Sequence, residues 1–573
     1  MFKKLAPCLK GYGKYALLAP ITIIFEVLLE IRIPFYMSKI IDVGIANQDV
    51  GYIARLGLLM VAVALLSLLC GSLSAFFAAK GAMGFGKGLR GAVFHKIQSF
   101  SFANIDKFNT ASLITRLTTD INNTQHTFMM LIRSFVRSPI MLISATIMAA
   151  SINKSLAVVF LVAIPVLGTA LIVIMLMAFP RFRKMLTCYD RMNGRVQENL
   201  IGIRVVKAFV REDYENEKFD KEADALRAAQ LSAERVLICN MPLMQLVIYA
   251  CIISILWFGG NMVLSGTMAN GQLISFISYV TQILVSLMMI SMVFVSLVMT
   301  RASVTRIFEV LDEEPDIADR QTDLTVRDGS IEFRDVSFSY ANDPENLNLE
   351  NINLSIAPGE TVGIIGGTGS AKSTLVQMIP RLYDCLSGAV YVGGEDVRSY
   401  SLEGLRDAVS MVLQKNLLFS GTILENLKWG NEAATMDEVI AACKAASAHD
   451  FITSFPNGYD TFLGQGGVNV SGGQKQRLCI ARALLKKPKI IILDDSTSAV
   501  DTATDAAIRK ALREELAGTT TIIIAQRISS VSDADKIVVM DDGRIDAVGT
   551  HDELLATNEI YREVYESQKK GVA

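Results

Sequence analysis

The chain contains an uninterrupted stretch of 65 residues, 236–300, without a single Asp, Glu, Lys or Arg. A helix crosses the apolar part of a bilayer with about 20 residues, so this stretch is long enough for two spans. Gly and Asn residues at 259–271 divide it, which is the composition of a turn. Shorter charge-free stretches occur at 56–79, 138–153 and 155–180. Together with an apolar opening helix at 15–40, the pattern predicts six transmembrane helices.

Charge is divided unevenly between the two halves of the chain. The formal charge is only −2, but residues 1–300 carry 28 basic and 16 acidic side chains, and residues 301–573 carry 27 and 41. A hydrophobic share of 51% excludes a disordered chain, and 8 scattered cysteines in 573 residues exclude a disulfide-rich secreted scaffold. The chain has no Cys-x-x-Cys pair and no His at ligand spacing, which argues against a metal or redox site built on them. We therefore expect two different kinds of domain.

Basic residues gather in alternate connections between the expected spans. They are dense before the first span and in 80–137 and 181–235, and sparse in 42–54, near Lys154 and in 259–271. Because cytoplasmic connections are enriched in Lys and Arg, both termini and the whole second half are predicted to lie in the cytoplasm, with the spans in the cell membrane. The two long basic connections are rich in helix formers, so we expect spanning helices to extend through them.

Two acidic residues, Glu26 and Glu30, lie one helical turn apart inside the first expected span. Ionisable groups are costly in a bilayer and need a reason to be there. One interpretation is a pair of cavity carboxylates that attracts cationic substrates. The other is an internal ion pair, or a group that reaches the outer surface. The residues alone leave both open.

The second half begins with alternating strands and helices from about residue 329. Strands are expected at 331–338 and 360–366, and a glycine-rich loop that opens a helix follows the second one. Backbone N–H groups of such a loop cradle phosphates, while Lys372 reaches the β- and γ-phosphates and the Ser373 hydroxyl can ligate Mg²⁺. The loop consists of Gly366, Gly367, Thr368, Gly369, Ser370, Ala371, Lys372, Ser373 and Thr374. Its usual glycine before the lysine is Ala371, which is expected to adopt helical φ and ψ angles and leave the cradle intact.

Two further motifs follow the phosphate loop. Residues 489–494 read as a buried strand that ends in Asp494, where a carboxylate ligand for the Mg²⁺ of the same nucleotide belongs. Between the loop and this strand lies Val-Ser-Gly-Gly-Gln-Lys-Gln-Arg at 470–477. The loop, Gln414 after a strand, this segment, the 489–494 strand and Ser498-Ala-Val-Asp501 occur in the order found in ABC ATPases. Preceded by six spans, the sequence resembles a half-transporter of the ABC exporter family over nearly its whole length.

The resemblance implies a fold of two parts. A polytopic α-helical membrane domain with six transmembrane helices is expected at 1–312, a linker at 313–329, and an α/β P-loop ABC nucleotide-binding domain at 330–573. Residues 102–123 resemble the family's first coupling segment. The implied function is ATP-driven export of amphipathic compounds, drugs or lipids, by a dimer in the lipid bilayer, with ATP and Mg²⁺ as cofactors and no nucleic acid as partner.

The resemblance also implies roles for individual residues. Tyr340 matches the aromatic residue that stacks on adenine, and Gln414 matches the glutamine near Mg²⁺. Asp501 belongs to the expected D-loop. A further group matches the signature that, in the family, contacts nucleotide held by the other subunit: Ser471, Gly472, Gly473 and Gln474.

Two departures from the family pattern concern hydrolysis. Asp495 stands where hydrolytic members place the glutamate that orients attacking water, and Gln526 stands where they place the switch histidine. A carboxylate one methylene short is misplaced by about 1 Å, which can lower a rate about a hundredfold. A glutamine cannot relay a proton as imidazole does. Two further departures concern the same site: Ala371 replaces the usual glycine, and Gln465 stands where relatives often have Glu. The signature residues, in contrast, are intact.

The residues of the chain's own hydrolytic site depart from the family pattern, whereas its signature does not. This difference predicts a heterodimer that resembles bacterial heterodimeric multidrug exporters with one degenerate site. The chain's own site would bind ATP but hydrolyse it poorly, and its signature would complete the partner's competent site. Three other interpretations stay open. They are a homodimer with two weak sites, an ATP-responsive membrane regulator or channel without net pumping, and an importer built on the exporter fold.

Overall fold

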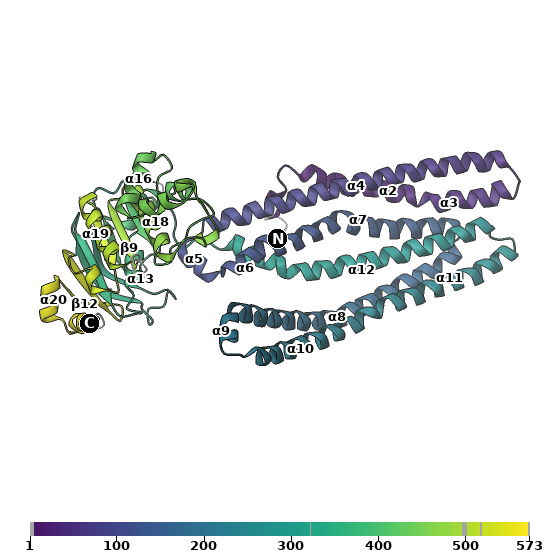
Figure 1. The fold of residues 1–573 in the computed structure, drawn as a ribbon. Helices are drawn as coiled ribbons and strands as arrows, with labels where there is room; N and C mark the ends of the chain where they lie inside the picture. The colour runs from purple at the N-terminus through teal and green to yellow at the C-terminus, as the bar shows by residue number, and fades with distance from the viewer. Residues whose placement is uncertain (1–4, 321, 496–500, 516–517, 571–573) are drawn as a thin grey trace. The chain divides into compact units, whose positions relative to one another are not determined.

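The computed structural model describes residues 5–320, 322–495, 501–515 and 518–570, and the chain folds into two compact units (Figure 1). The first unit comprises Met1–Ser99 and Asn109–Glu313, and the second comprises Phe100–Phe108 and Glu314–Ala573. The short segment Phe100–Phe108 therefore belongs to the second unit, although in sequence it lies between helices of the first.

The first unit is built from long helices. The predicted helical extensions are confirmed, because α4 (Val50–Gln98), α8 (Lys154–Ile201) and α10 (Glu212–Ile238) continue through the two basic connections. The predicted turn is also confirmed, since α11 (Asn240–Leu264) ends shortly before α12 (Asn270–Asp312) begins. The remaining elements are η1 (Ala6–Leu9), α2 (Gly13–Glu30), α3 (Arg32–Lys39), η2 (Ile40–Ile45), α6 (Thr110–Thr115), η3 (Arg116–Asp120), α7 (Ile121–Ile152) and α9 (Ile203–Ala208).

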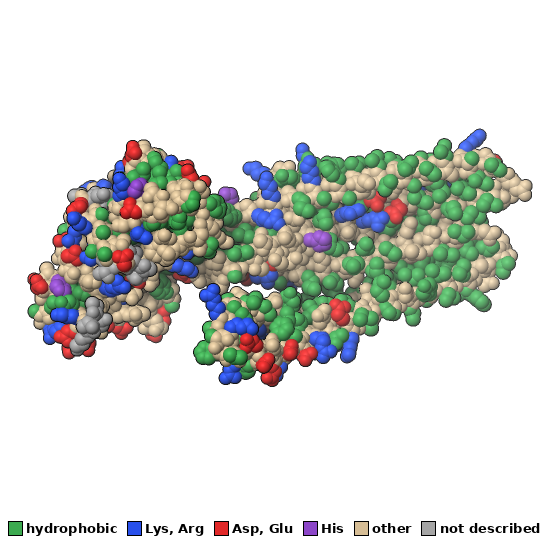
Figure 2. All heavy atoms as spheres, viewed as in Figure 1, with side chains coloured by type: hydrophobic (Ala, Val, Ile, Leu, Met, Phe, Trp, Pro, Cys, Tyr) green, Lys and Arg blue, Asp and Glu red, His purple; other side chains and the backbone are tan. Residues whose placement is uncertain are grey.

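Five helical stretches among the described residues are long and apolar enough to cross a membrane. They are Val50–Gln98, Thr110–Ile152, Lys154–Ile201, Glu212–Leu264 and Asn270–Asp312. The opening helix predicted as a sixth span differs from them. It is divided into α2 and α3, and the 18 residues of α2 include the ionisable residues Lys14, Glu26 and Glu30. In Figure 2, hydrophobic side chains cover much of the surface around α11, whereas charged side chains gather along α10.

Close backbone contacts fix the opening segment to α4 and α12. A Cβ atom on Gly88 of α4 would lie 2.1 Å from the carbonyl oxygen of Cys8, so only glycine allows this approach. The buried hydroxyl of Tyr279 in α12 donates to the carbonyl oxygen of Ile31, between α2 and α3, over 3.0 Å. The ionisable residues of α2 thus lie on a helix that is packed within the bundle.

The second unit contains a six-stranded sheet in the order β12-β11-β3-β10-β9-β6. Its strands are β3 (Thr361–Gly366), β6 (Val409–Val412), β9 (Ile490–Asp494), β10 (Thr520–Ile524), β11 (Lys536–Asp541) and β12 (Arg544–Gly549). All neighbours pair in parallel except β11 and β12. β3, β9 and β10 consist largely of buried aliphatic residues, as expected for a parallel sheet covered on both faces.

A four-stranded antiparallel sheet and a ring of helices complete this unit. The sheet has the order β2-β1-β4-β5, from β1 (Ile331–Phe338), β2 (Leu349–Ile356), β4 (Ser387–Val392) and β5 (Glu395–Asp396), and a small pair is formed by β7 (Gly421–Thr422) and β8 (Phe462–Leu463). The helices are α5 (Phe102–Lys107), α13 (Lys372–Gln377), α14 (Leu402–Ala408), α15 (Ile423–Lys428), α16 (Met436–Ala445), α17 (His449–Ser454), α18 (Gly472–Leu485), α19 (Thr502–Glu515), α20 (His551–Thr557) and α21 (Glu559–Lys570). Short 3-10 turns lie between them: η4 (Val397–Ser399), η5 (Gly458–Asp460), η6 (Gln465–Gly467) and η7 (Ile528–Ser530). The strands predicted at 331–338, 360–366 and 489–494 are confirmed as β1, β3 and β9.

Candidate nucleotide-binding site

The carboxyl ends of three adjacent strands bring the predicted site residues together. β10 pairs with β3 on one side and with β9 on the other, and all three run in parallel. The phosphate loop follows β3, Asp494 ends β9, and Gln526 follows β10. In open parallel sheets the carboxyl edge is where ligands bind, because loops from neighbouring strands converge there. Segments distant in the sequence thus meet at one edge.

The phosphate loop encloses the ammonium group of Lys372. Its Nζ donates to the carbonyl oxygens of Gly366 and Gly367, over 2.9 and 2.6 Å. A Cβ on Gly366 would lie 2.2 Å from the carbonyl oxygen of Met540, so this position accepts only glycine. Burial lowers the pKa of Lys372, and the charges of Asp494 and Asp495 oppose that shift. A half-buried cation in a loop that opens a helix is suited to an anionic phosphate.

Ala371 differs from the sequence expectation. It does not adopt helical angles but is left-handed, with φ 65° and ψ 24°, immediately before α13. This conformation costs a non-glycine residue roughly 1–2 kcal/mol, because its Cβ crowds the following carbonyl oxygen. The conformation of the loop therefore explains why a glycine is usual at this position, and Ala371 holds strain there.

Ser373 and Asp494 fit a magnesium ion. The Ser373 hydroxyl donates to Oδ1 of Asp494 over 2.9 Å, and Asp494 is only 2% exposed. Burial raises the pKa of Asp494, and the hydrogen bond from Ser373 opposes this rise. A hydroxyl oxygen beside a buried carboxylate at the end of a phosphate loop is the kind of hard oxygen pair that Mg²⁺ prefers. These two residues would hold the ion, which would neutralise charge on the bound phosphates.

The two departures from the hydrolytic pattern contact each other. Nε2 of Gln526 donates to Oδ2 of Asp495 over 2.8 Å. Burial raises the pKa of Asp495, and hydrogen bonds from Gln526 and Gln414 oppose the rise. Gln476 of α18 also donates to the carbonyl oxygen of Asp495 over 3.5 Å. Three glutamine side chains thus donate to Asp495, and the charges of Lys372 and Arg527 also act on its carboxylate. Gln414 joins Asp495 and Gln526 at the same edge.

Tyr340 lies on an aromatic cluster beside the phosphate loop. Its ring is T-shaped against Phe338 and Tyr383, with centroid distances of 4.9 and 5.2 Å. Its hydroxyl is 3.0 Å from Oγ1 of Thr374 in α13. With half of its surface exposed, the ring can still receive a flat base.

Tyr383 is a residue that the sequence analysis missed. Its hydroxyl donates to Oδ2 of Asp106 in α5 over 2.5 Å, and its ring contacts Phe102 edge-on at 6.0 Å. The α5 helix is therefore connected, through Tyr383, to Tyr340. Only the resemblance of 102–123 to a coupling segment pointed to this region, and nothing in the sequence pointed to Tyr383.

The signature residues lie at the start of α18. Ser471 caps this helix in a reciprocal capping box, in which its hydroxyl accepts from the N–H of Gln474 and the Gln474 side chain accepts from the N–H of Ser471. Ser471 and Gly472 are exposed, while Gly473 and Gln474 are partly buried. Exposed N–H groups at the start of a 14-residue helix suit an anion that arrives from outside the unit.

The expected D-loop is described only at its end. Asp501 caps α19 by accepting from the N–H of Thr504 over 2.9 Å. This hydrogen bond lowers the pKa of Asp501. Ser498, Ala499 and Val500 lie outside the described residues.

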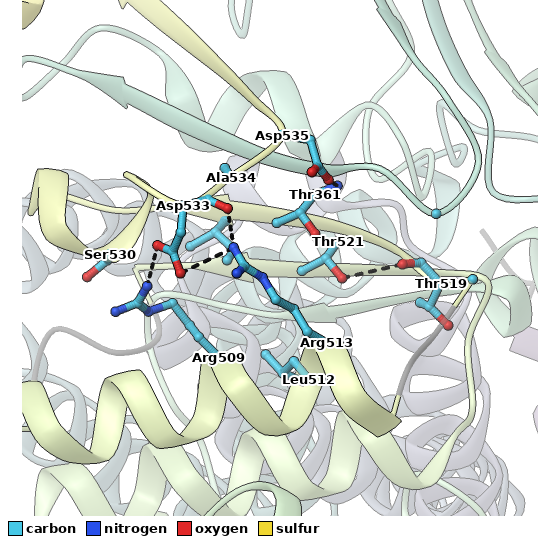
Figure 3. A pocket seen from close by; sticks show the side chains of 13 residues that line it. Thr361, Arg509, Leu512, Arg513, Thr519, Thr521, Ser530, Asp533, Ala534 and Asp535 are labelled. Atoms are coloured by element: carbon cyan, nitrogen blue, oxygen red, sulfur yellow. Dashed lines mark hydrogen bonds and ion pairs between the residues drawn. The ribbon is translucent and has the colours of Figure 1, made fainter. Parts of the chain in front are cut away.

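A separate cavity of about 310 Å³ lies at the opposite edge of the sheet (Figure 3). It is lined by Thr361 at the start of β3 and by Thr521 near the start of β10. Arg509 and Arg513, which would attract an anion there, point toward Asp533 and form ion pairs of 2.7 and 3.2 Å with it. The cavity is therefore no part of the phosphate site.

In the first unit, the acidic pair of α2 meets an arginine of α7. Nη2 of Arg137 is 2.6 Å from Oε2 of Glu30 and 3.4 Å from Oε1 of Glu26. This geometry favours the interpretation as an internal ion pair. The charge of Arg133 also acts on Glu26. Oε2 of Glu26 is nevertheless buried without a hydrogen-bond partner among the described residues.

Comparison with known proteins identifies both units. Residues 16–287 match the family model of the ABC transporter transmembrane region, and residues 349–498 match the ABC transporter model. The uncharacterised ABC transporter ATP-binding protein YfiB of Bacillus subtilis is 40% identical over 560 residues, covering 98% of this chain and 97% of the relative. An ATP-dependent lipid A-core flippase of Syntrophus aciditrophicus is 34% identical over 494 residues, covering 84% of this chain and 80% of the relative.

Among solved structures, the chain is similar to a bacterial Atm1-family ABC exporter with ATP bound. The TM-score is 0.85 at 26% identity, and the match covers 97% of this chain and 99% of that one. ABC exporters work as dimers in a lipid bilayer, and the ABC ATPase domain implies ATP binding with Mg²⁺. The chain therefore belongs to the ABC transporter family, as an ATP-hydrolysing half-transporter with an Atm1-like exporter fold.

Proposed function

We propose that this chain is one half of a heterodimeric exporter of amphipathic compounds, and that its own nucleotide site binds ATP but hydrolyses it poorly. The observation that carries the proposal is the hydrogen bond between Gln526 and Asp495. An amide proton of Gln526 is used to hold the carboxylate. The side chain of Asp495 is one methylene shorter than that of glutamate, and its carboxylate accepts hydrogen bonds from the amides of Gln526 and Gln414.

The expected consequence is slow chemistry with retained binding. A general base must lie within hydrogen-bond reach of the proton that it removes, and a displacement of about 1 Å can lower the rate about a hundredfold. Lys372, Ser373 and Asp494 keep the groups that hold phosphates and Mg²⁺. Binding and hydrolysis are therefore affected differently.

The intact signature supports a partner with a competent site. Ser471 is an exposed helix cap. Its N–H and that of Gln474 are used by the capping box, so a phosphate would be bound by the N–H groups of Gly472 and Gly473. In the family, a signature of this kind contacts nucleotide on the other subunit. A chain with a poor hydrolytic site and an intact signature would then serve the partner's site better than its own.

A second surface of this chain supports an association between subunits. The connection between α8 and α10 carries apolar side chains that are 61–81% exposed: Leu200, Ile201, Val205, Phe209 and Val210. Basic residues on both sides of it favour a cytoplasmic position, where apolar side chains are not covered by lipid. An exposed apolar cluster of this kind marks a site that a protein partner covers.

In the proposed cycle, ATP closes the two nucleotide-binding domains, and the long helices transmit that motion to the spans. The nucleotide can shift this equilibrium because it makes more contacts in the closed dimer than in the open one. Within this chain, α5 is part of the nucleotide-binding unit, and in the sequence it lies directly between α4 and α6 of the first unit. A site that retains ATP would keep the domains in contact between turnovers at the partner's site.

The proposed cargo is a drug or a lipid. The flippase relative acts on a lipid, according to its name, which favours an amphipathic cargo here. The buried carboxylate oxygen Oε2 of Glu26, which has no hydrogen-bond partner among the described residues, favours a cationic group on it. Transport into inverted vesicles made with this chain and its partner half tests the proposal. ATP-dependent accumulation of a cationic dye supports it, and ATP-independent flux would favour a channel or regulator instead.

A further inference from the structure

The last turn of the C-terminal helix α21 holds the segment that carries Gln526. The side-chain amide of Gln568 makes two hydrogen bonds to it. Nε2 donates to the carbonyl oxygen of Gln526 over 2.7 Å, and Oε1 accepts from the N–H of Ile528 over 2.9 Å. One carboxamide therefore pairs with the backbone on both sides of Arg527, as a neighbouring strand would.

The segment is held by few other elements, which makes this contact significant. It follows β10, whose pairing with β3 continues to the hydrogen bond from the Ala525 N–H to the Ile364 carbonyl oxygen, and it ends at Ile528, which is buried in the core. Between these two points, Gln526 and Arg527 are exposed. An exposed segment of this kind opens easily unless its backbone groups are paired.

The position of Gln568 is itself fixed by the body of α21. Tyr561 is fully buried, its hydroxyl is 2.7 Å from Nδ1 of His551, and its N–H donates to Oδ1 of Asn558 over 2.8 Å. Val564 and Tyr565 pack against the core from the same helix. The last turn is thus a rigid extension of a packed helix rather than a free tail.

We propose that Gln568 is a positioning residue. By holding the backbone of residues 526–528, it sets how Gln526 presents its side-chain amide to the γ-phosphate. The chain of contacts is short. Gln568 fixes the backbone at Gln526, and the Gln526 side chain holds Asp495 over 2.8 Å. The inference rests on the proposed nucleotide site, in which the amide of Gln526, at the position of the family's switch histidine, can donate to the γ-phosphate. It extends that site to the C-terminal helix.

This arrangement predicts an effect on the γ-phosphate and none on the rest of the nucleotide. Among the residues that the structure describes, the hydrogen bonds of Lys372 go to the phosphate loop, and Ser373 and Asp494 bond to each other, so none of these bonds reaches Gln568 or the segment after β10. Loss of the two Gln568 hydrogen bonds should therefore weaken binding of a triphosphate but leave binding of ADP unchanged. Because the two Gln568 hydrogen bonds act on the γ-phosphate only through the position of Gln526, we expect the ratio of the two affinities to fall about threefold to tenfold.

The test compares Gln568→Ala with Gln568→Glu in the full chain, in detergent or nanodiscs. Alanine favours the helix, so the first variant removes the hydrogen bonds without breaking α21. Glutamate keeps the acceptor for the Ile528 N–H but cannot donate to the Gln526 carbonyl. Glu566→Ala, at an exposed position of the same helix, is the matched control. Affinities for ADP and for a nonhydrolysable ATP analogue give the ratio, and hydrogen exchange of the Ile528 amide reports the backbone.

We expect Gln568→Ala to raise exchange at Ile528 about tenfold and to lower the affinity ratio. Gln568→Glu should preserve Ile528 protection but still lower the ratio, and Glu566→Ala should change neither. Faster exchange with an unchanged ratio would show a merely structural role and overturn the proposal, as would no change in either variant. Because the analogue is not hydrolysed, the result is independent of whether the site is hydrolytically impaired, which the ATPase rate of the wild-type chain reports separately.

Discussion

Nε2 of Gln526 donates a hydrogen bond to Oδ2 of Asp495 over 2.8 Å. The two residues are 31 positions apart, and they meet because β9 and β10 are adjacent parallel strands. Each replaces a group of the hydrolytic ABC pattern, so their contact ties two substitutions into one unit. An acid held by an amide at this place is consistent with a site that binds ATP and rarely cleaves it.

Restoring both groups should restore hydrolysis. In the chain carrying Asp495→Glu with Gln526→His, the carboxylate gains one methylene and the switch gains an imidazole, which can carry a proton. We expect ATP turnover at this site to rise about tenfold to a hundredfold, as measured by phosphate release. Either single variant should give less than the pair, because the two side chains contact each other. An unchanged rate in the double variant would assign the impairment to other positions.

The strain at Ala371 should be removable. Glycine adopts the left-handed region without penalty, so Ala371→Gly should raise the free energy of unfolding by about 1 kcal/mol. Gly369 has φ 89°, so Gly369→Ala is the matched variant and should destabilise the unit. Thermal unfolding with and without nucleotide checks both. A lower melting temperature for Ala371→Gly would contradict the conformation described for the loop.

The Mg²⁺ dependence of ATP binding should rely on Ser373 and Asp494. Asp494→Asn removes the anionic oxygen and leaves a neutral group of the same shape. We expect it to weaken the Mg²⁺-dependent part of ATP binding at least about tenfold and to have little effect on binding measured in EDTA. Titration of bound nucleotide with Mg²⁺ measures this directly. An equal loss under both conditions would show that Asp494 acts on the fold of the loop instead.

The contact of Tyr383 with Asp106 should affect how the cargo stimulates the ATPase, and it should have little effect on ATP binding. Tyr383→Phe keeps the aromatic cluster around Tyr340 and removes the hydrogen bond to α5. We expect ATP affinity to change less than about twofold, and cargo stimulation of the ATPase to fall, when this chain is assembled with its partner. Asp106→Asn retains an acceptor and should have a smaller effect. Equal cargo stimulation of the ATPase in Tyr383→Phe and the wild type would show that Tyr383 does not transmit the effect of the cargo.

The acidic pair in α2 should select for charge on the cargo. Glu26→Gln leaves Glu30 to pair with Arg137, so the bundle retains its short ion pair and loses the carboxylate whose Oε2 has no hydrogen-bond partner among the described residues. Transport of a cationic dye should fall several-fold, and transport of a neutral analogue should be preserved. Glu30→Gln leaves Arg137 with the longer contact only and should impair both cargos. A loss that is equal for both dyes in Glu26→Gln would assign the pair to packing alone.

The sequence analysis succeeded where a local pattern determines a structure. Charge-free runs predicted the long apolar helices, and runs of buried aliphatic residues predicted β3 and β9. Local spacing also placed Lys372 and Ser373 in the loop that opens α13. In each case, the physical requirement is met by residues that are neighbours in the sequence.

The remaining features depend on contacts between distant residues. The left-handed angle of Ala371 contradicts what alanine prefers by itself, because the loop around it imposes the conformation. Tyr383 and Asp106 are 277 positions apart, and no periodicity indicates that α5 joins the second unit. Glu26 and Glu30 are evident in the sequence of the opening helix, but the division of that helix into α2 and α3 after Glu30 is not.

The central claim is that this chain retains ATP while its partner cleaves it, and photolabelling of the assembled pair tests this most directly. An azido-ATP with ³²P at the α- or the γ-position would be incubated with Mg²⁺ and crosslinked, and the two subunits separated by size. The account predicts that this chain keeps both labels in equal amounts, while the partner subunit keeps the α-label and loses the γ-label. Loss of the γ-label from this chain as fast as from the partner would contradict it.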